Sequence, residues 1–338
     1  MAKTTIKDVA RIAGVGVGTV SRVINNSNAV SDETRQKVKQ AIEALNYQPN
    51  EMARRLSLGK TYTVSVLAPF FTRPAFVQRL RGLESVFAQS EYDFIIYNVD
   101  SAASRDKYFR QLSRPERTDG LLIMSIIPHK EHAERFLGSK VPTVLVDADH
   151  DAFTRVLIDD LNGGYKATNH LIELGHRKIG MVSDFLLETP FNYRSVFQRH
   201  EGYRTALKEA GIPFRPDYFL QCDVDKDAAR ETAVKLLTHP DPPTAIFAYS
   251  DTHAFGVLQA AEMLNINIPD DLSIVGYDDI ELSEYLHLTT MRQSLFDAGA
   301  HGAKLLLNLI TNQTEIIEKT VLASKLIERR TTAPPTSQ

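Results

Sequence analysis

The stretch Thr5–Asn25, TIKDVARIAGVGVGTVSRVIN, decides the fold of the N-terminal part of the chain. It predicts two short helices around a tight turn, because apolar residues recur at helical spacing on both sides of Ala13-Gly14-Val15. Gly14 can take a positive φ without steric cost, so the two helices can meet at a steep angle. This pattern is typical of a helix-turn-helix, and an ordinary helical hairpin within a core is the alternative.

The second predicted helix carries small, polar and guanidinium side chains away from its apolar face. They are Val17, Gly18, Thr19, Ser21, Arg22 and Asn25. Such a face suits insertion into the major groove of DNA. Ser31 can cap a third helix whose apolar stripe, Val38, Ile42 and Leu45, would cover the first two.

Charge is distributed unevenly along the chain. Residues 1–60 carry ten Lys or Arg and five Asp or Glu, whereas the remainder carries 29 and 37. A basic head on an acidic body is typical of a nucleic-acid-binding module joined to a domain of another kind.

Length and composition restrict the class of protein. At 338 residues the chain is expected to hold two or three domains. Its one cysteine, Cys222, excludes an internal disulfide framework and a multi-cysteine zinc site. The sequence has no run long enough for a membrane span and no signal-peptide core, which predicts a cytoplasmic protein. Phosphate-binding loops, dinucleotide fingerprints and a hydrolase nucleophile motif are missing, so we expect no cofactor, no metal and no enzymatic activity.

From Thr61 onward, buried strands alternate with amphipathic helices, and the pattern restarts after Asp160. Two successive sets of this kind predict an α/β region of two doubly wound parallel-sheet lobes. Ligands in such sheets bind outside the carboxyl ends of the strands, so two lobes can enclose a cleft between those ends.

Polar and aromatic side chains gather at the predicted strand ends. Phe70 and Phe71 follow the first strand, and Asp147, Asp159 and Asp278 end or follow later ones. Carboxylates and a guanidinium can hold vicinal hydroxyls, and aromatic rings can stack on a pyranose, so the chemistry indicates a sugar or polyol site. The alternative is that aspartates at strand ends cap the following helices, for which Asp251 and Asp160 are the best candidates.

The head resembles the lactose/galactose repressor (LacI/GalR) family of bacterial transcription regulators. The matching strings are TIKDVARIAGV, TVSRVIN, VSDETRQKV, ALNYQPN and ARRL. The resemblance implies a homodimer that places its recognition helices in successive major grooves of a near-palindromic operator. It also implies that a short hinge helix on each chain enters the minor groove. There Leu56 would wedge between the central base pairs, and Ala53 would let the paired hinge helices approach closely.

The resemblance also suggests roles for individual residues of the head. Arg22 fits guanine O6 and N7, and Val17 a thymine methyl. The remaining DNA-binding candidates are Thr5, Gly18, Thr19, Ser21, Asn25, Tyr47 and Asn50, most of them as phosphate contacts. Gly16 stands where the family usually has Ser, and Gly18 has no side chain to read a base, so the preferred operator is expected to differ at those base pairs.

Strings further along, LIELGHRKIG, EGYRTAL, IPDDLSIVGYDD, TTMRQ and LIERRTT, resemble the family's effector domain, which is similar to periplasmic sugar-binding proteins. By position, Asp147, Arg199, Ser250 and Asp278 match effector contacts, and Gln293 lies near the same cleft. Ser250 replaces the usual Asn and loses a donor–acceptor pair, for which Phe70, Phe71 and Arg73 are candidate substitutes.

These patterns divide the chain into a helix-turn-helix domain (1–47), a hinge helix and linker (48–60), an effector-binding and dimerisation domain (61–332) and a disordered tail (333–338). The N-lobe is expected at about 61–160 plus 292–320, and the C-lobe at about 161–290 plus 321–332.

The expected function is a repressor of carbohydrate-utilisation genes whose operator affinity a small sugar-like effector controls. Within that class, a purine- or nucleoside-responsive corepressed regulator is the alternative. A sugar-binding receptor without DNA function and a sugar-modifying enzyme are rivals from other classes. The basic head disfavours the first rival, and the lack of a nucleophile–base pair disfavours the second.

Overall fold

The computed structural model describes residues 4–25, 28–48, 59–186, 194–312 and 316–336. It divides into two compact units, Met1–Tyr62 and Thr63–Gln338. The predicted hinge helix, with Asn50, Ala53 and Leu56, lies outside the described residues.

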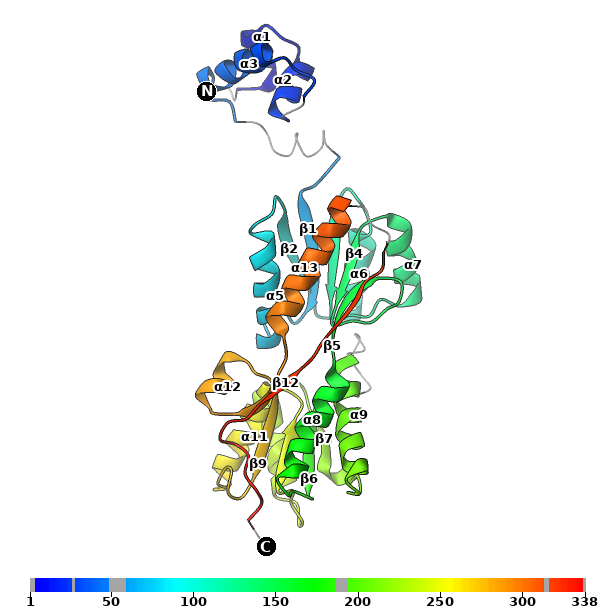
Figure 1. Ribbon diagram of the computed structural model, residues 1–338, viewed down its shortest axis with the longest axis vertical. Coiled ribbons are helices and arrows are strands. Elements are labelled where there is room, and N and C mark those ends of the chain that lie inside the picture. The colour runs from blue at the N-terminus through cyan, green and yellow to red at the C-terminus, as the bar shows by residue number, and fades with distance from the viewer. Residues whose placement is uncertain (1–3, 26–27, 49–58, 187–193, 313–315, 337–338) are drawn as a thin grey trace. The chain divides into compact units, whose positions relative to one another are not determined.

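The described residues of the first unit form three helices, α1 (Ile6–Ala13), α2 (Val17–Ile24) and α3 (Asp32–Ala44) (Figure 1). Gly14 ends α1 with a φ of 66°, as the sequence predicts for the turn. The Ser31 side chain accepts a hydrogen bond from the Thr34 backbone N–H, which confirms the predicted cap of α3. Val9, Val20 and Val38, one from each helix, are fully buried against one another. The helices therefore form the predicted helix-turn-helix.

The second unit contains two six-stranded sheets with helices on both faces. The first sheet holds β1 (Thr63–Pro69), β2 (Asp93–Val99), β3 (Gly120–Met124), β4 (Thr143–Val146), β5 (Thr154–Ile158) and β11 (Lys319–Leu322). The second holds β6 (Ile179–Ser183), β7 (Phe219–Gln221), β8 (Ala245–Ala248), β9 (Ser273–Asp278), β10 (Thr289–Arg292) and β12 (Lys325–Ile327).

The two sheets share one topology. Their orders are β11-β5-β4-β3-β1-β2 and β12-β10-β9-β8-β6-β7, and every pairing is parallel except β10 with β12. In each sheet the strand that comes first in the chain lies between the second and the third. Ligands bind at such a switch point, outside the carboxyl ends of the strands.

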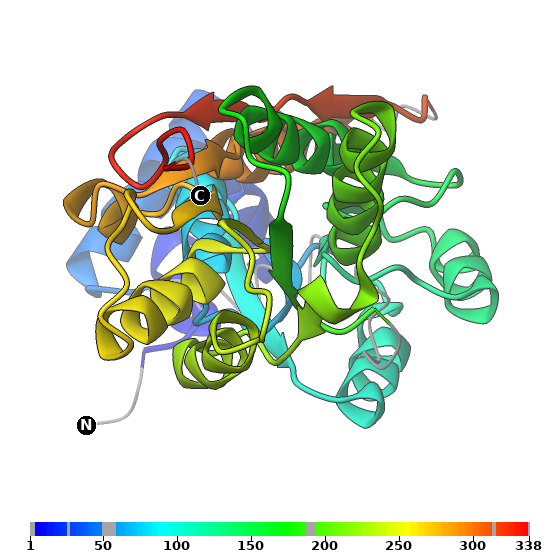
Figure 2. The same ribbon diagram turned by 90° about the horizontal axis from the view of Figure 1, so that it is seen from below.

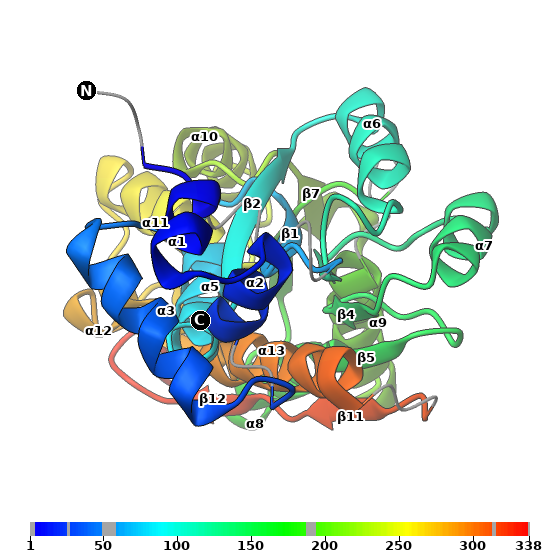
Figure 3. The same cartoon turned by 90° about the horizontal axis from the view of Figure 1, so that it is seen from above.

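Helices cover both faces of each sheet. In the N-lobe, formed around the first sheet, these are α5 (Pro74–Phe87), α6 (Ala102–Leu112), α7 (Lys130–Ser139) and α13 (Leu295–Asn312). In the C-lobe they are α8 (Asp160–Glu173), α9 (Arg194–Glu209), α10 (Lys226–Leu237), α11 (Asp251–Met263) and α12 (Glu281–Tyr285), with a 3₁₀ turn at Pro216–Tyr218. Figure 3 shows α6 and α7 on the opposite side of the first sheet from α5 and α13.

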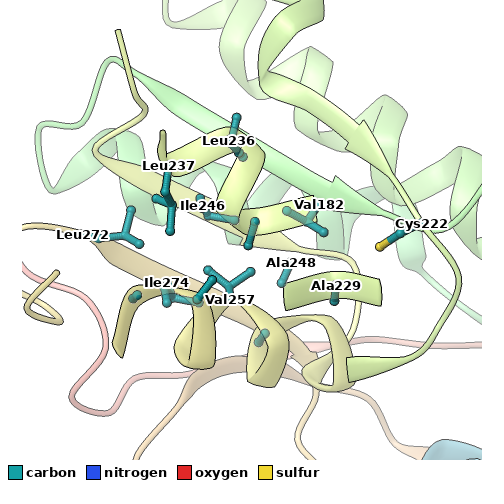
Figure 4. Close-up of a cluster of buried hydrophobic side chains, with 14 of the residues drawn as sticks. Val182, Cys222, Ala229, Leu236, Leu237, Ile246, Ala248, Val257, Leu272 and Ile274 are labelled. Atoms are coloured by element: carbon teal, nitrogen blue, oxygen red, sulfur yellow. The ribbon is translucent and has the colours of Figure 1, made fainter. Parts of the chain in front are cut away.

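The C-lobe core is packed mainly by small and branched aliphatic side chains. Figure 4 shows Val182 and Ile246 of the sheet facing Ala229 of α10 and Val257 of α11. Figure 2 shows the pair α8 and α9 on one side of this sheet and α10 and α11 on the other. Both faces are dry, which explains why the strands read as continuous apolar runs.

The chain passes between the lobes three times, after Ile158, between Arg292 and Leu295, and between Leu322 and Lys325. β11 continues to Leu322, two residues beyond the expected end of the N-lobe segment. Because three segments of the chain connect the lobes, the angle between the lobes can change while they stay joined.

The tail prediction is wrong for residues 333–336. The Ala333 carbonyl accepts a hydrogen bond from the Ser273 hydroxyl at 3.0 Å, and His176 Nε2 lies 2.9 Å from the same oxygen. The Thr336 hydroxyl donates to the Asp270 carbonyl. These side-chain partners fix a Pro-rich segment that has no apolar pattern of its own. Among the described residues, no helix has both the length and the apolar character that a membrane span requires.

Close packing of α8 on α9 generates a stability prediction. A Cβ on Gly202 would lie 2.2 Å from the Leu161 carbonyl oxygen and 2.5 Å from the Tyr165 nitrogen. Gly202→Ala should therefore lower the free energy of unfolding by more than about 2 kcal/mol, because backbone atoms cannot move aside easily. Urea denaturation measures the change.

Gly138→Ala in α7 is the matched control, because no atom lies within 4 Å of the added Cβ. It should leave stability unchanged or raise it by up to about 1 kcal/mol. Equal effects of the two substitutions would contradict the tight α8–α9 contact.

Candidate functional site

A small cavity of about 70 Å³ lies between the two lobes, at the carboxyl ends of both sheets. Six of the predicted effector residues line it: Arg73, Asp147, Arg199, Ser250, Asp278 and Gln293. They come from both lobes, so the structure brings together residues that are up to 220 positions apart in the chain.

Arg199 of α9 is a deeply buried charge of the cavity wall, with 3% of its surface exposed. Its Nε donates to Asp160 Oδ1 at 2.8 Å, and one terminal nitrogen donates to the Tyr249 carbonyl at 2.7 Å. The guanidinium also lies 3.7 Å from the centre of the Tyr277 ring. Because a buried cation is tolerated only when it is paired, these contacts fix the guanidinium in one orientation at the cavity wall.

The N-lobe wall contains a second buried arginine, Arg79 of α5. Arg79 lies 3.0 Å from Asp147 Oδ2, and the Ser125 hydroxyl donates to the same oxygen at 2.7 Å. Arg79 also donates to Gln293 Oε1 at 3.3 Å. The sequence prediction missed both Arg79 and Ser125, because it selected acidic and aromatic residues at strand ends. Arg79 lies within a helix, and Ser125 follows β3 but is neither acidic nor aromatic.

Gln293 connects the two arginine sites. It lies on the segment between β10 and α13, where the chain crosses between lobes, and its amide nitrogen donates to Asp278 Oδ1. Asp278 in turn lies 3.8 Å from Arg199. A continuous polar chain therefore runs from Asp147 through Arg79, Gln293 and Asp278 to Arg199. It joins the N-lobe to the C-lobe along the cavity wall.

Burial alters the pKa values of the acids in this chain. Desolvation raises the pKa of Asp278 to about 6, although Arg199 and Arg79 lower it. Desolvation also raises the pKa of Asp160, against the lowering by Arg199. Hydrogen-bond donors on a ligand that face Asp278 would favour its charged form and so would bind better above that pKa.

Three predicted effector residues, Phe70, Phe71 and Asp159, do not line the cavity. The Arg73 guanidinium lies 4.1 Å from the centre of the Phe70 ring, so Phe70 supports Arg73 instead of stacking on a ligand. Phe71 is partly exposed and does not line the cavity either. The aromatic rings that do line it are Phe76 and Tyr249.

Two assignments at strand ends are wrong by one residue. Asp159, predicted as an effector contact, caps α8 by accepting from the Asn162 backbone N–H. Asp160, predicted as a cap, is the buried partner of Arg199. Similarly, Ser250 and not Asp251 caps α11, while the Asp251 carboxylate accepts from the Ser283 and Thr290 hydroxyls. Sequence alone does not define the residue at which a helix begins.

Ser250 is therefore both a cap and a cavity residue. Its Oγ accepts from the His253 backbone N–H at 3.3 Å and lies 2.8 Å from His253 Nδ1. The His253 ring is fully buried, and desolvation lowers its pKa to about 3. The imidazole is consequently neutral at physiological pH.

Five of the eleven predicted DNA-binding residues lie on α2: Val17, Gly18, Thr19, Ser21 and Arg22. Arg22 is exposed and Val17 has 42% of its surface exposed. A Cβ on Gly18 would meet open space, so this position adds no contact of its own. Thr5 differs, because its hydroxyl donates to Asp8 and belongs to the capping box of α1. Tyr47 packs partly against the core of the head.

Fold and site together define a class: a protein with a helix-turn-helix head and a two-lobed small-molecule-binding region. Residues 5–50 match the model of bacterial regulatory proteins of the lacI family, and residues 168–332 match that of a periplasmic binding protein-like domain. The chain belongs to the LacI family of bacterial transcription regulators.

Individual relatives match over nearly their whole length. The ribose operon repressor of Escherichia coli K12 is 35% identical over 332 residues, covering 96% of this chain and 98% of that one. The transcriptional repressor PurR of Photorhabdus laumondii is 34% identical, covering 96% of each chain. The structure of the lac repressor dimer bound to operator and the anti-inducer ONPF is 26% identical, covers 98% of this chain and all of that one, and gives a TM-score of 0.84.

The neutral, buried imidazole of His253 predicts how stability depends on pH. The unfolded chain binds a proton at this histidine below about pH 6.5, whereas the folded protein does not until about pH 3. Acidification from about pH 7 to about pH 5 should therefore cost the wild type about 2 kcal/mol more of its unfolding free energy than it costs His253→Gln. Urea denaturation at the two pH values measures both losses. Equal losses would contradict a neutral ring in the folded state.

Proposed function

We propose that this regulator represses carbohydrate-utilisation genes and that a neutral sugar in the inter-lobe cavity controls its affinity for the operator. The observation that carries the proposal is the composition of the cavity wall. Three guanidinium groups, Arg73, Arg79 and Arg199, face three carboxylates, Asp147, Asp184 and Asp278. Equal numbers of opposite charges suit a ligand that is uncharged and that both donates and accepts many hydrogen bonds.

The names of relatives support the same reading, since one is a ribose operon repressor. Another relative is the repressor PurR, and Phe76 with Tyr249 could hold a flat base. However, eleven of the sixteen residues that line the cavity are Arg, Asp, Ser, Thr or Gln, and the two predicted stacking rings, Phe70 and Phe71, do not line it. A sugar therefore fits the wall better than a purine, and purines belong in the same binding screen.

For the DNA-bound state, we propose a homodimer on a near-palindromic operator at the nucleoid, with no enzymatic activity of its own. Arg22 would read guanine and Val17 a thymine methyl, while Thr19, Ser21, Asn25, Tyr47 and Asn50 would position the head on phosphates. Residues 48–60 would form the hinge, with Ala53 and Leu56 in the minor groove.

Control would act through the polar chain that joins the lobes. A ligand that donates to Asp147 and Asp278 competes with Arg79 and Gln293 for the same oxygens. Its binding therefore favours one angle between the lobes over another, which is the differential affinity that any ligand-induced shift requires. In a dimer, a change of that angle alters the spacing of the two hinge segments and so the affinity for DNA.

Arg22→Ala tests the DNA-binding face. Loss of a bidentate guanine contact should weaken binding to the selected operator by about 1–3 kcal/mol and relax specificity at one position of each half-site. Fluorescence anisotropy with operator variants measures both effects. Lys39→Ala on α3 is the control, since Lys39 is exposed and lies on a different helix. If Arg22→Ala keeps full discrimination between operator variants, the assignment is wrong.

Asp278→Ala tests the cavity. The variant should still bind operator but should lose its response to the effector, because the carboxylate that faces both Arg199 and Gln293 is gone. Asp270→Ala, at an exposed position outside the cavity wall, should respond like the wild type. The measurement is operator affinity with and without saturating sugar. An unaltered response in Asp278→Ala would show that the effector binds elsewhere.

A further inference from the structure

The hydroxyl group of Ser250 contacts a buried imidazole, that of His253, three residues further along the chain. Ser250 ends the loop after β8 and lines the cavity, with 4% of its surface exposed. Its Oγ lies 2.8 Å from His253 Nδ1, and the ring of Tyr249 stands perpendicular to the imidazole at 5.6 Å. Nothing in the regulator mechanism given above uses His253.

The protonation of His253 follows from its surroundings. The ring is fully buried, and the charges nearest to it, Arg73 and Arg199, disfavour a second cation. A neutral imidazole carries one N–H and one acceptor nitrogen. Desolvation disfavours a proton on the ring, whereas the backbone carbonyl of Cys222 favours one. A carbonyl can only accept, so the ring proton belongs on the nitrogen that faces it.

Nδ1 already contacts the Ser250 hydroxyl, so Nε2 is the ring nitrogen that can direct a proton toward the Cys222 carbonyl. That contact falls short of regular hydrogen-bond geometry, since Nε2 has no regular partner among the described residues. With the proton on Nε2, Nδ1 is an acceptor, and Ser250 must donate its hydroxyl proton to it. The opposite tautomer would leave a bare nitrogen lone pair buried against a carbonyl oxygen, which is unfavourable.

A serine hydroxyl has one proton and two lone pairs. In Ser250 the proton is used by His253 Nδ1, and one lone pair accepts from the His253 backbone N–H. A single lone pair therefore remains for the cavity. We infer that Ser250 acts on the effector only as a hydrogen-bond acceptor, that His253 is the positioning residue that makes it so, and that the effector presents a hydroxyl or amine hydrogen at this point.

This inference rests on the proposed ligand site in the cavity and adds a selection rule to it. An effector whose corresponding atom can only accept, such as an ether, a carbonyl or a fluorine, would place two lone pairs against each other. Ser125 shows the same arrangement on the N-lobe wall, because its proton is used by Asp147. Both serines would thus select for donors on the ligand.

The first experiment determines the tautomer directly and needs no ligand. Long-range ¹H–¹⁵N spectra of the full chain labelled at histidine nitrogens should show His253 with an unprotonated Nδ1 and a protonated Nε2. His253→Gln assigns the signals. Both shifts should stay constant between about pH 5 and pH 8, in contrast to those of an exposed histidine. A proton on Nδ1 would overturn the inference, because the Ser250 hydroxyl would then be free to donate into the cavity.

The second experiment tests the consequence for binding, with D-ribose as the probe. Calorimetry compares ribose with analogues in which fluorine, which accepts but does not donate, replaces one hydroxyl at a time. One analogue should lose about tenfold or more in affinity to the wild type relative to ribose. In Ser250→Ala, the affinity for ribose should exceed that for this analogue by about threefold or less. The same is expected in His253→Leu, because the Ser250 hydroxyl is then free to rotate and donate to the ligand.

If the ratio of the ribose affinity to the analogue affinity is the same in both variants as in the wild type, the role of Ser250 and His253 is contradicted. A substitution that only disturbs the structure of the cavity would weaken the binding of ribose and of its analogue equally. If ribose does not bind even to the wild type, the proposal of a ribose-like effector fails. The tautomer spectrum then still decides whether Ser250 is restricted to accepting.

Discussion

The buried guanidinium of Arg199 is the interaction on which the ligand-binding region depends. It joins α8 through Asp160, the end of β8 through the Tyr249 carbonyl and the end of β9 through Asp278. Removing Asp160, the carboxylate closest to the guanidinium, would leave the Arg199 charge poorly compensated in a site of low dielectric, which is strongly destabilising. The same requirement for pairing explains why polar residues from three different elements converge at one point of the cavity.

The close contact of α8 with α9 makes this convergence possible. Gly164 and Gly202 allow the two helix backbones to approach each other, and Arg199 lies within that crossing. Across the cavity, Arg79 of α5 occupies a comparable place and pairs with Asp147. Gln293 connects the two arginine systems at a point where the chain itself crosses between lobes. A ligand that enters the cavity must therefore exchange hydrogen bonds with groups that hold both lobes.

The helix-turn-helix and the two-lobed architecture could be predicted from sequence because their signals are local. The left-handed turn at Gly14 and the Ser31 cap depend on residues within one helical turn. The central strands of both sheets are buried on two faces and therefore read as apolar runs. Six effector candidates line the cavity because parallel strands place their carboxyl ends at one edge.

The remaining features depend on distances that sequence does not contain. The roles of Asp159 and Asp160, like those of Ser250 and Asp251, depend on where a helix begins to within one residue. Arg79 and Phe76 lie on α5, whose apolar spacing predicts only that one face of the helix packs in the core. They line the cavity because residues of the other lobe lie opposite the start of this helix. The ordered segment 333–336 is held by His176 and Ser273, which are distant in sequence.

The most direct test of a ligand-controlled DNA-binding regulator is one titration. The operator is first selected from random duplexes with the full-length protein, and its affinity is then measured alone and with a panel of sugars, sugar phosphates, nucleosides and purine bases. Our account predicts a near-palindromic selected sequence and a neutral sugar that changes the affinity by about 5–150-fold. Failure to enrich any sequence, or an affinity that no compound of the panel changes, would contradict it.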